Sequence, residues 1–234
     1  MPPLRRGPIE ALRAAVGPLL HPRRRTSSQA QRHRFTTIFR GNAWHDPESV
    51  SGPGSTRARG ADFRDALVAL IRELRVASIA DAPCGDFNWM RDVLAECDLP
   101  YTGVDIVEPL IEANARTHAA PARRFVCADM TRADLPAADL IVCRDGLVHL
   151  SFADARAAIE NFRRSGSRYL LATTFVQRSE NRDVPTGGWR VLNMQAPPFS
   201  FPAPLTTIDE RCVHSDGIYR DKRLGLWELA ALGR

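Results

Sequence analysis

Between residues 61 and 174, short apolar runs alternate with segments whose apolar residues recur at helical spacing. The first such segment, 61–74, places Phe63, Leu67 and Ile71 on one face, as expected of a helix that lies against a sheet. Neighbouring parallel strands need a helical crossover, so strict alternation predicts a parallel sheet with helices on both faces. The fold class expected is α/β, with a doubly wound, mostly parallel sheet.

Seven strand-like segments account for this sheet. Five lie at 77–81, 101–105, 124–128, 140–143 and 169–174. Helices are expected at 61–74, 88–97, 108–118 and 152–164. A connection rich in Pro and Gly, 176–204, then leads to strand-like segments at 205–209 and 223–229 with no helix between them. Two successive strands without a crossover predict an antiparallel C-terminal hairpin at the edge of a seven-stranded sheet.

Arginines gather at the start of the chain, ahead of the alternating region. The 234 residues carry a net charge of +5, and the run at 23–25 is entirely arginine. We expect 1–34 to be a basic, flexible leader, 35–60 to be a cap or lid segment, and 61–234 to be the main domain. A basic arm suits nucleic acid or another anionic partner as well as solvent, so its role stays open.

The cysteine spacing and the hydropathy indicate in which cellular compartment the protein is expected. Five cysteines without a paired short spacing predict neither a disulfide framework nor a zinc site, and a reducing cytoplasm fits them. The partly apolar stretch 9–20 is interrupted by Glu10, Arg13 and Pro18, so it is too short and too broken for a membrane span. We therefore expect a cytoplasmic protein with no membrane span and no metal ion.

The stretch 78–89 predicts a ligand site at the end of the first strand. Its apolar run ends in Asp81, a tight turn carries Pro83 and Gly85, and Asn88 can cap the helix that follows. Ligands of open α/β sheets bind outside the carboxyl ends of the strands, where backbone N–H groups and a helix N-terminus face the crevice. The loop therefore indicates a nucleotide-type cofactor; an ordinary structural strand–helix turn is the alternative.

The next two strands also end in aspartate. Asp105 follows Gly85 by twenty residues, the spacing at which a carboxylate accepts hydrogen bonds from both hydroxyls of a ribose. Asp129 is placed to accept from an exocyclic amine, with Met130 able to pack on a flat base. Three aspartates after three consecutive strands are more specific for a nucleoside than any one of them alone.

With these motifs, the region 35–232 resembles the class I S-adenosylmethionine-dependent methyltransferases. The resemblance implies S-adenosylmethionine as cofactor, with its methionine part at the first loop, its ribose at the second acid and its adenine at the third. The implied cofactor contacts are Asp81, Pro83, Cys84, Gly85, Asp105, Ile106, Asp129, Met130 and Arg144. Pro83 and Phe87 stand where the family often has glycine, which leaves the loop geometry open and counts against a nicotinamide cofactor.

The segment 141–151 resembles the stretch that faces the transferred methyl group in this family, which implies a reaction centre over 145–149. Methyl transfer needs positioning and, for a hydroxyl nucleophile, removal of a proton. His149 is the expected catalytic base because an imidazole ordinarily titrates near neutrality, and Asp145 would orient the cofactor amine or the nucleophile. Alternatively, His149 only caps or packs the start of the helix at 152–164.

The long connection 176–204 is the expected acceptor loop, because loops of this length inside a compact domain are more often functional than idle. In the family this region commonly helps to form the acceptor pocket. Trp189 offers a stacking face, Arg190 a donor for an anion or hydroxyl, and Asn193 an amide that both donates and accepts. The alternative is that Trp189 plugs an edge of the core.

These features predict an enzyme that moves the methyl group of S-adenosylmethionine to an O or N nucleophile of a small polar molecule or glycan. One alternative is a nucleic-acid methyltransferase that uses the basic leader, but the chain lacks an Asn/Asp-Pro-Pro-Tyr/Phe motif and we expect no nucleic-acid partner. A non-catalytic partner subunit that binds the cofactor is another alternative. The acceptor, the methylated atom and the oligomeric state stay open.

Overall fold

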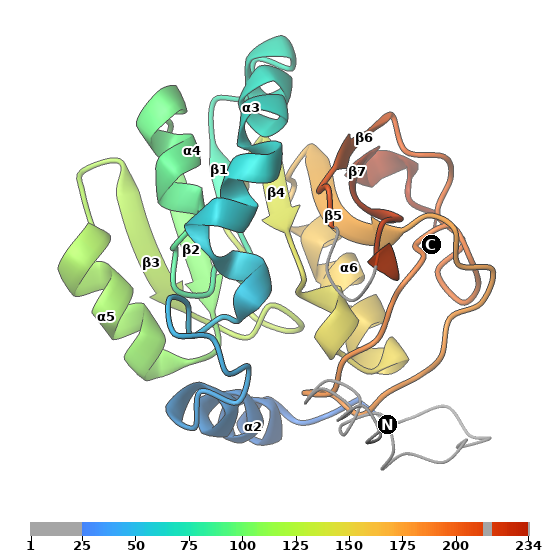
Figure 1. Ribbon diagram of the computed structural model, residues 1–234, viewed down its shortest axis with the longest axis horizontal. Helices are drawn as coiled ribbons and strands as arrows, with labels where there is room; N and C mark the ends of the chain where they lie inside the picture. The colour runs from blue at the N-terminus through green and yellow to red at the C-terminus, as the bar shows by residue number, and fades with distance from the viewer. Residues whose placement is uncertain (1–24, 213–216, 234) are drawn as a thin grey trace, which may run out of the picture.

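The computed structural model describes residues 25–212 and 217–233, which form one seven-stranded sheet with helices on both faces (Figure 1). The strands are β1 (Ile79–Asp81), β2 (Tyr101–Asp105), β3 (Arg123–Cys127), β4 (Leu140–Cys143), β5 (Tyr169–Phe175), β6 (Thr206–Asp209) and β7 (Lys222–Glu228). The α-helices are α2 (Ser28–Arg40), α3 (Arg57–Glu73), α4 (Met90–Cys97), α5 (Glu108–His118) and α6 (Phe152–Arg164). Short 3₁₀ turns are η1 (Pro53–Ser55), η2 (Leu147–His149) and η4 (Leu229–Ala231).

The strand order is β3-β2-β1-β4-β5-β7-β6. The first five strands are parallel, β7 runs antiparallel to β5, and β6 runs antiparallel to β7. This sheet confirms the expected doubly wound fold with an antiparallel C-terminal pair. Because β7 pairs with β5 along its whole length, the last strand lies inside the sheet and β6 forms the edge.

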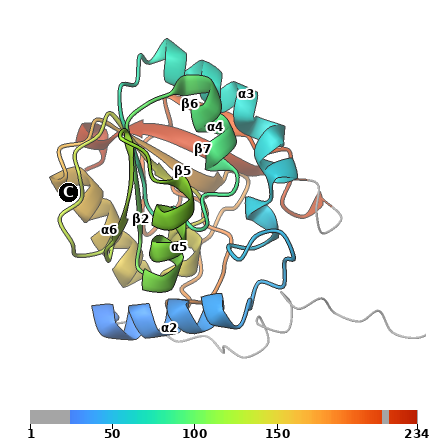
Figure 2. The same ribbon diagram turned by 90° about the vertical axis from the view of Figure 1, so that its left-hand side faces the viewer.

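Alternate residues of the central strands pack on opposite faces of the sheet. Leu140 and Val142 belong to the core that includes α3 and α4, whereas Ile141 and Cys143 belong to the core that includes α6. Figure 2 shows α3 and α4 on one side of the sheet and α6 on the other. Both faces are therefore apolar, which is why the strands read as continuous apolar runs in the sequence.

Three helices begin at hydroxyl caps. The side chains of Ser27, Thr56 and Ser151 each accept a hydrogen bond from the backbone N–H three residues further on, at the start of α2, α3 and α6. The prediction that Asn88 caps α4 is wrong. The helix begins at Met90, and the Asn88 side-chain amide donates instead to Glu48 Oε1 at 2.7 Å. Asn88 thus ties the loop after β1 to the segment before α3.

Helix α2 crosses the boundary expected at residue 34. Gln31, Phe35, Ile38 and Phe39 recur at helical spacing, so one amphipathic pattern runs from the expected leader into the expected cap segment. The helix lies across the end of the sheet at which the parallel strands finish (Figures 1 and 2). The larger part of the expected leader, 1–24, lies outside the described residues.

Candidate active site

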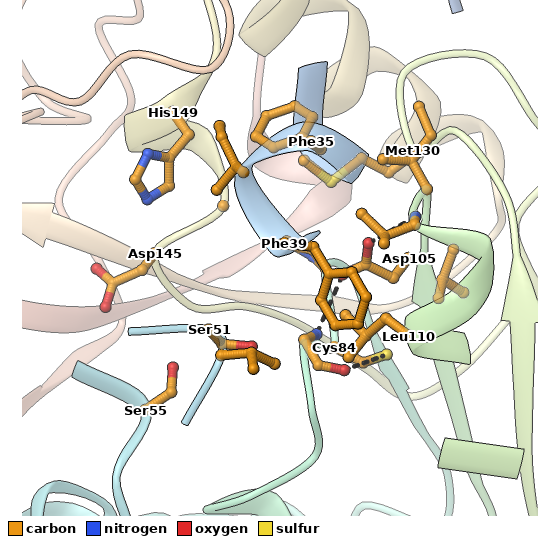
Figure 3. Close-up of a pocket in the computed structure, with 18 of the residues that line it drawn as sticks. Phe35, Phe39, Ser51, Ser55, Cys84, Asp105, Leu110, Met130, Asp145 and His149 are labelled. Carbon is orange, nitrogen blue, oxygen red and sulfur yellow. Dashed lines mark hydrogen bonds between the residues drawn. The ribbon is translucent and has the colours of Figure 1, made fainter. Parts of the chain in front are cut away.

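A cavity opens at the carboxyl ends of β1, β2, β3 and β4, the edge at which an open α/β sheet binds ligands. The strand-end loops form one wall, and α2 with the segment 44–55 forms the other (Figure 3). Ten predicted site residues line it: Pro83, Cys84, Gly85, Asp105, Ile106, Asp129, Met130, Arg144, Asp145 and His149. The structure therefore brings most of the predicted cofactor and catalytic residues together.

The loop after β1 is a tight turn at the cavity wall. Gly85 has a φ of +53°, and a Cβ there would lie 2.4 Å from Ser51 Oγ, so only glycine fits. Phe87 also adopts a left-handed φ, of 58°, and its ring is fully buried against Tyr101 and Phe125. The bulky residue that departs from the family's glycine pattern is therefore placed in the core, away from the cavity.

Asp105 ends β2 and lines the cavity. Its Oδ2 accepts a hydrogen bond from the Gly85 N–H at 3.2 Å, and its Oδ1 accepts one from the Val107 N–H at 3.0 Å. Burial raises the pKa of Asp105, and these backbone hydrogen bonds oppose the shift. The two carboxylate oxygens offer about four acceptor positions in all, so capacity remains for a ligand's hydroxyl groups.

Asp129 lines the cavity too, but protein donors surround its carboxylate. Oδ1 accepts from the Thr131 N–H at 2.8 Å and the Thr131 hydroxyl at 2.7 Å, and Oδ2 accepts from Arg132 Nη1 at 3.1 Å. The Ser28 hydroxyl bonds the same carboxylate. Burial raises the pKa of Asp129, yet the hydrogen bonds outweigh it and the pKa falls below the ordinary value. Four donors fill the usual acceptor capacity, so this side chain anchors the start of α2.

Asp81 does not line the cavity. Its side chain is buried beneath the loop after β1, where Oδ2 accepts a hydrogen bond from the Tyr101 hydroxyl at 2.8 Å. Oδ1 has no hydrogen-bond partner in the part of the chain that the structure describes. Burial raises the pKa of Asp81 to about 7. Asp81 therefore has a structural place in the core next to the loop after β1, and not a place at the cavity surface.

Arg144, Asp145, Glu210 and Lys222 form a buried ionic cluster beside the cavity. Arg144 Nη2 and Nε donate to Glu210 Oε2 at 2.6 and 3.0 Å. Lys222 Nζ lies 2.6 Å from Asp145 Oδ2 and 3.2 Å from Glu210 Oε2. Two cations and two carboxylates balance one another, as charges taken out of water require. The Arg144 guanidinium is thus committed to Glu210, although the residue lines the cavity.

Asp145 is the carboxylate of this cluster that faces the cavity. Its backbone has a φ of 53°, and its N–H donates to the Thr173 hydroxyl at 2.8 Å, which holds the residue in that conformation. Burial alone would raise the pKa of Asp145, but Lys222 and Arg144 hold it well below its usual range. Asp145 is therefore ionised at neutral pH.

His149 lies at the same end of the cavity as Asp145 (Figure 3). Its Nδ1 is 2.7 Å from the carbonyl oxygen of Gly188, which can only accept, so Nδ1 carries the proton and Nε2 keeps a lone pair. Burial lowers the pKa of His149, opposed by the Gly188 carbonyl and Asp145. The ring centroid is 4.7 Å from that of Trp44. The result is a neutral imidazole with one basic nitrogen.

Three predicted acceptor contacts do not line the cavity: Trp189, Arg190 and Asn193. Trp189 packs edge-on against Tyr219, Arg190 donates to the Leu150 carbonyl, and the Asn193 amide donates to the Arg178 carbonyl at 2.7 Å. The backbone of the loop contacts the site instead. The Gly187 N–H donates to the carbonyl of His149 at 2.7 Å, so the loop holds η2 in place.

Helix α2 supplies apolar side chains to the cavity from the start of the segment 35–60, which was expected to be a cap or lid. Phe35, Ile38 and Phe39 lie on the face of the helix that lines the cavity, and all three are only partly buried because that face meets open space (Figure 3). The signal was present in their helical spacing. All three lie after the boundary expected at residue 34, but the helix that carries them begins before it, at Ser28.

Hydrogen bonds fasten this second wall at both ends. Before α2, the Thr26 N–H donates to Asp154 Oδ1 at 2.9 Å. After α2, the Ser49 hydroxyl donates to Asp86 Oδ2 at 2.7 Å, and the Asp86 N–H donates to Ser51 Oγ at 2.9 Å. The wall is therefore joined directly to the loop after β1 and to the start of α6.

Residues 79–166 match the family model described as a methyltransferase domain, and they include the loop after β1, Asp105, Asp129 and His149. The chain thus carries a methyltransferase domain, in line with its resemblance to the class I S-adenosylmethionine-dependent methyltransferases. The cofactor of this methyltransferase is S-adenosylmethionine. Within residues 25–212 and 217–233, no group of three or more His, Cys, Asp or Glu is placed to hold a metal ion, and no helix is long and apolar enough to cross a membrane.

The methyltransferase is similar in fold to 1,6-didemethyltoxoflavin-N1-methyltransferase of Burkholderia thailandensis, solved with 1,6-didemethyltoxoflavin and S-adenosylhomocysteine bound. The identity is 16%, the TM-score is 0.61, and the match covers 90% of this chain and 93% of that one. The sugar N-methyltransferase KedS8 of a Streptoalloteichus species matches with 21% identity and a TM-score of 0.41, over 48% of this chain and 47% of that one.

The methyltransferase domain of bacterial CtHen1-C matches with 16% identity and a TM-score of 0.42, over 47% of this chain. That match spans 63% of the domain, which is less than two thirds of its length. No curated protein matches the sequence.

We predict that Lys222→Met destabilises this methyltransferase through the ionic cluster. Removing one partner of a buried ion pair costs about 3–5 kcal/mol, because the carboxylates of Asp145 and Glu210 lose a cation. The neighbouring Arg223→Met is the matched control, since Arg223 pairs with a half-exposed Asp209 and such surface pairs contribute about 0–1 kcal/mol. The free energy of unfolding in urea measures both. Equal losses in the two variants would contradict the assigned cluster.

We predict that Asp81→Asn flattens the pH dependence of stability. The raised pKa means that folded Asp81 keeps its proton between its ordinary pKa, 3.8, and about 7, whereas the unfolded chain has lost it. Stability therefore falls as the pH rises through that window, and the asparagine variant gains relative to the wild type. Urea unfolding of both proteins near pH 4 and near pH 7 gives the difference between their free energies of unfolding at each pH. If the free energies of unfolding of the wild type and the variant differ by the same amount at both pH values, the prediction is contradicted.

Proposed function

We propose that this methyltransferase acts on an O or N nucleophile of a small polar molecule or glycan, with His149 as the base and Asp145 beside it. The observation that carries the proposal is the neutral His149 imidazole, whose Nδ1 is bonded to Gly188 and whose Nε2 is left with a lone pair at the cavity. When bound, S-adenosylmethionine supplies a methyl group on a sulfonium for in-line displacement.

Figure 3 shows Asp105, Leu110 and Met130 at one end of the cavity and Asp145 and His149 at the other, and in this proposal the cofactor lies between these two ends. We assign the ribose hydroxyls to Asp105, whose carboxylate keeps acceptor capacity. Met130 and Leu110 offer apolar side chains to the adenine. Asp129 is a less suitable partner for the adenine amine than the sequence indicated, because protein donors fill its carboxylate.

The methionine part is assigned to the backbone of 83–85, where Gly85 permits the closest approach. Asp145, ionised and fixed by Lys222, can accept a hydrogen bond from an ammonium group or from the nucleophile. Asp145 lies at the same end of the cavity as His149. The cofactor therefore presents its methyl group toward His149 in this assignment.

His149 removes the proton of the nucleophile in this proposal. The Gly188 carbonyl fixes the tautomer, so the lone pair of Nε2 is the group that accepts the proton. The negative charge of Asp145 favours the imidazolium that results, because it raises the pKa of His149 while burial lowers it. The proton thus moves to a nitrogen whose charge the site compensates.

Two observations support a small acceptor. Helix α2 and the segment 44–55 cover the cavity, so the space beside His149 is bounded by protein on both sides. The similar structure that matches nearly the whole chain holds a small molecule, 1,6-didemethyltoxoflavin, together with S-adenosylhomocysteine. A long polymer would have to displace this cover.

The test is a methyl-transfer screen over phenols, amino sugars and N–H heterocycles, followed by kinetics on the best acceptor. We expect a methylated product by mass spectrometry and a fall in kcat of about 10²–10⁴-fold in His149→Gln, since general base catalysis contributes on that order. Because burial lowers the pKa of His149, the acidic limb of the wild-type rate profile should lie below the ordinary value of 6.5 and vanish in the variant.

His118→Gln serves as the control, because His118 lies on α5 and does not line the cavity. Its kinetics should match the wild type. Methyl transfer that proceeds at the same rate and with the same acidic limb in His149→Gln would remove His149 as the base. Cofactor binding without product from any acceptor would favour the non-catalytic alternative.

A further inference from the structure

A second cavity lies on the other side of α2. It is bounded by the helix face that carries Ala30, His33, Arg34 and Thr37 and by the segment 185–187 of the long connection after β5. We call it the entry cavity. Ile38 and Trp44 line both this cavity and the candidate active site, so two side chains form the partition between them. Trp44 also contacts the ring of His149.

The entry cavity has a one-sided charge. Its lining contains the arginine and histidine of α2 and several hydroxyl side chains, and no aspartate or glutamate. Arg34 is exposed, and its guanidinium makes no hydrogen bond or ion pair with the residues at 25–212 and 217–233. A guanidinium presents several N–H donors in a planar fork that matches carboxylate and phosphate oxygens.

The side chain of Arg34 is held close to the reaction centre. Its aliphatic stem lies against Gly187, where an added Cβ would come within 2.2 Å of Arg34 Cδ. The same Gly187 donates its N–H to the carbonyl of His149, and the next residue, Gly188, accepts from Nδ1 of the imidazole. Arg34 is therefore packed on the very peptides that orient the expected base.

We propose that the entry cavity receives the acceptor and that Arg34 binds an oxyanion on it, either a carboxylate or a phosphate. This rests on the proposed function and adds the chemical class of its substrate. The oxyanion is held on the outer side of the partition, and the nucleophile reaches beside Trp44 to His149.

The experiment measures binding to the full chain saturated with S-adenosylhomocysteine, using probes that differ in charge: salicylate against salicylamide, and glycerol phosphate against glycerol. Calorimetry should show at least one anionic probe bound about tenfold or more tightly than its neutral partner. A preference for salicylate over salicylamide identifies a carboxylate as the oxyanion. A preference for glycerol phosphate over glycerol identifies a phosphate. Arg34→Gln should abolish the preference, and Arg34→Lys should restore part of it.

Arg40→Gln is the matched control, because Arg40 is exposed on the same helix and lines neither cavity. It should keep the preference of the wild type. A preference that survives in Arg34→Gln overturns the inference, and so does equal binding or absent binding of the charged and neutral probes. The affinity for S-adenosylhomocysteine and the methyl-transfer screen are read separately, so the proposed function can stand when this inference fails.

Discussion

The candidate site depends on a charge balance buried at the carboxyl edge of the sheet. Arg144, Asp145, Glu210 and Lys222 are costly to bury apart from one another, so folding must bring the four side chains together. They come from the loop after β4, from the residue after β6 and from the first residue of β7. Their pairing therefore fixes the C-terminal strands against the centre of the sheet and turns Asp145 toward the cavity as a carboxylate. The antiparallel end of the sheet in this way supports the candidate reaction centre.

The rest of the site is completed from outside the matched methyltransferase domain. Residues 79–166 supply the strand-end loops and His149, whereas α2 and 44–55 supply the opposite wall and Gly188 fixes the imidazole. The proposed cofactor contacts thus lie within the matched region. His149, the proposed base, also lies within it, whereas the other walls proposed to face the acceptor, among them Trp44, lie outside it.

Local pattern was enough to predict β2, β4, α5 and α6 with their observed bounds, because each is a run with a single period between clear turn residues. Longer-range features were not predictable in this way. Glu210 and Arg144 are 66 positions apart, and no local pattern pairs them. Asp129 follows β3 closely, as expected, but its donors include Ser28 of a helix that begins within the expected leader. Arg190 and Asn193 have suitable chemistry for an acceptor, yet each donates to a backbone carbonyl and neither lines the cavity.

The most direct test of the account is calorimetric titration of the wild type and of Asp105→Ala with S-adenosylhomocysteine. We predict micromolar binding by the wild type and a loss of about tenfold or more in the variant, roughly 1.4 kcal/mol or more, because the ribose hydroxyls lose their acceptor. Thermal unfolding of the variant confirms that it is folded. Equal affinity in the two proteins, or no binding by the wild type, would contradict the placement of the cofactor at the ends of these strands.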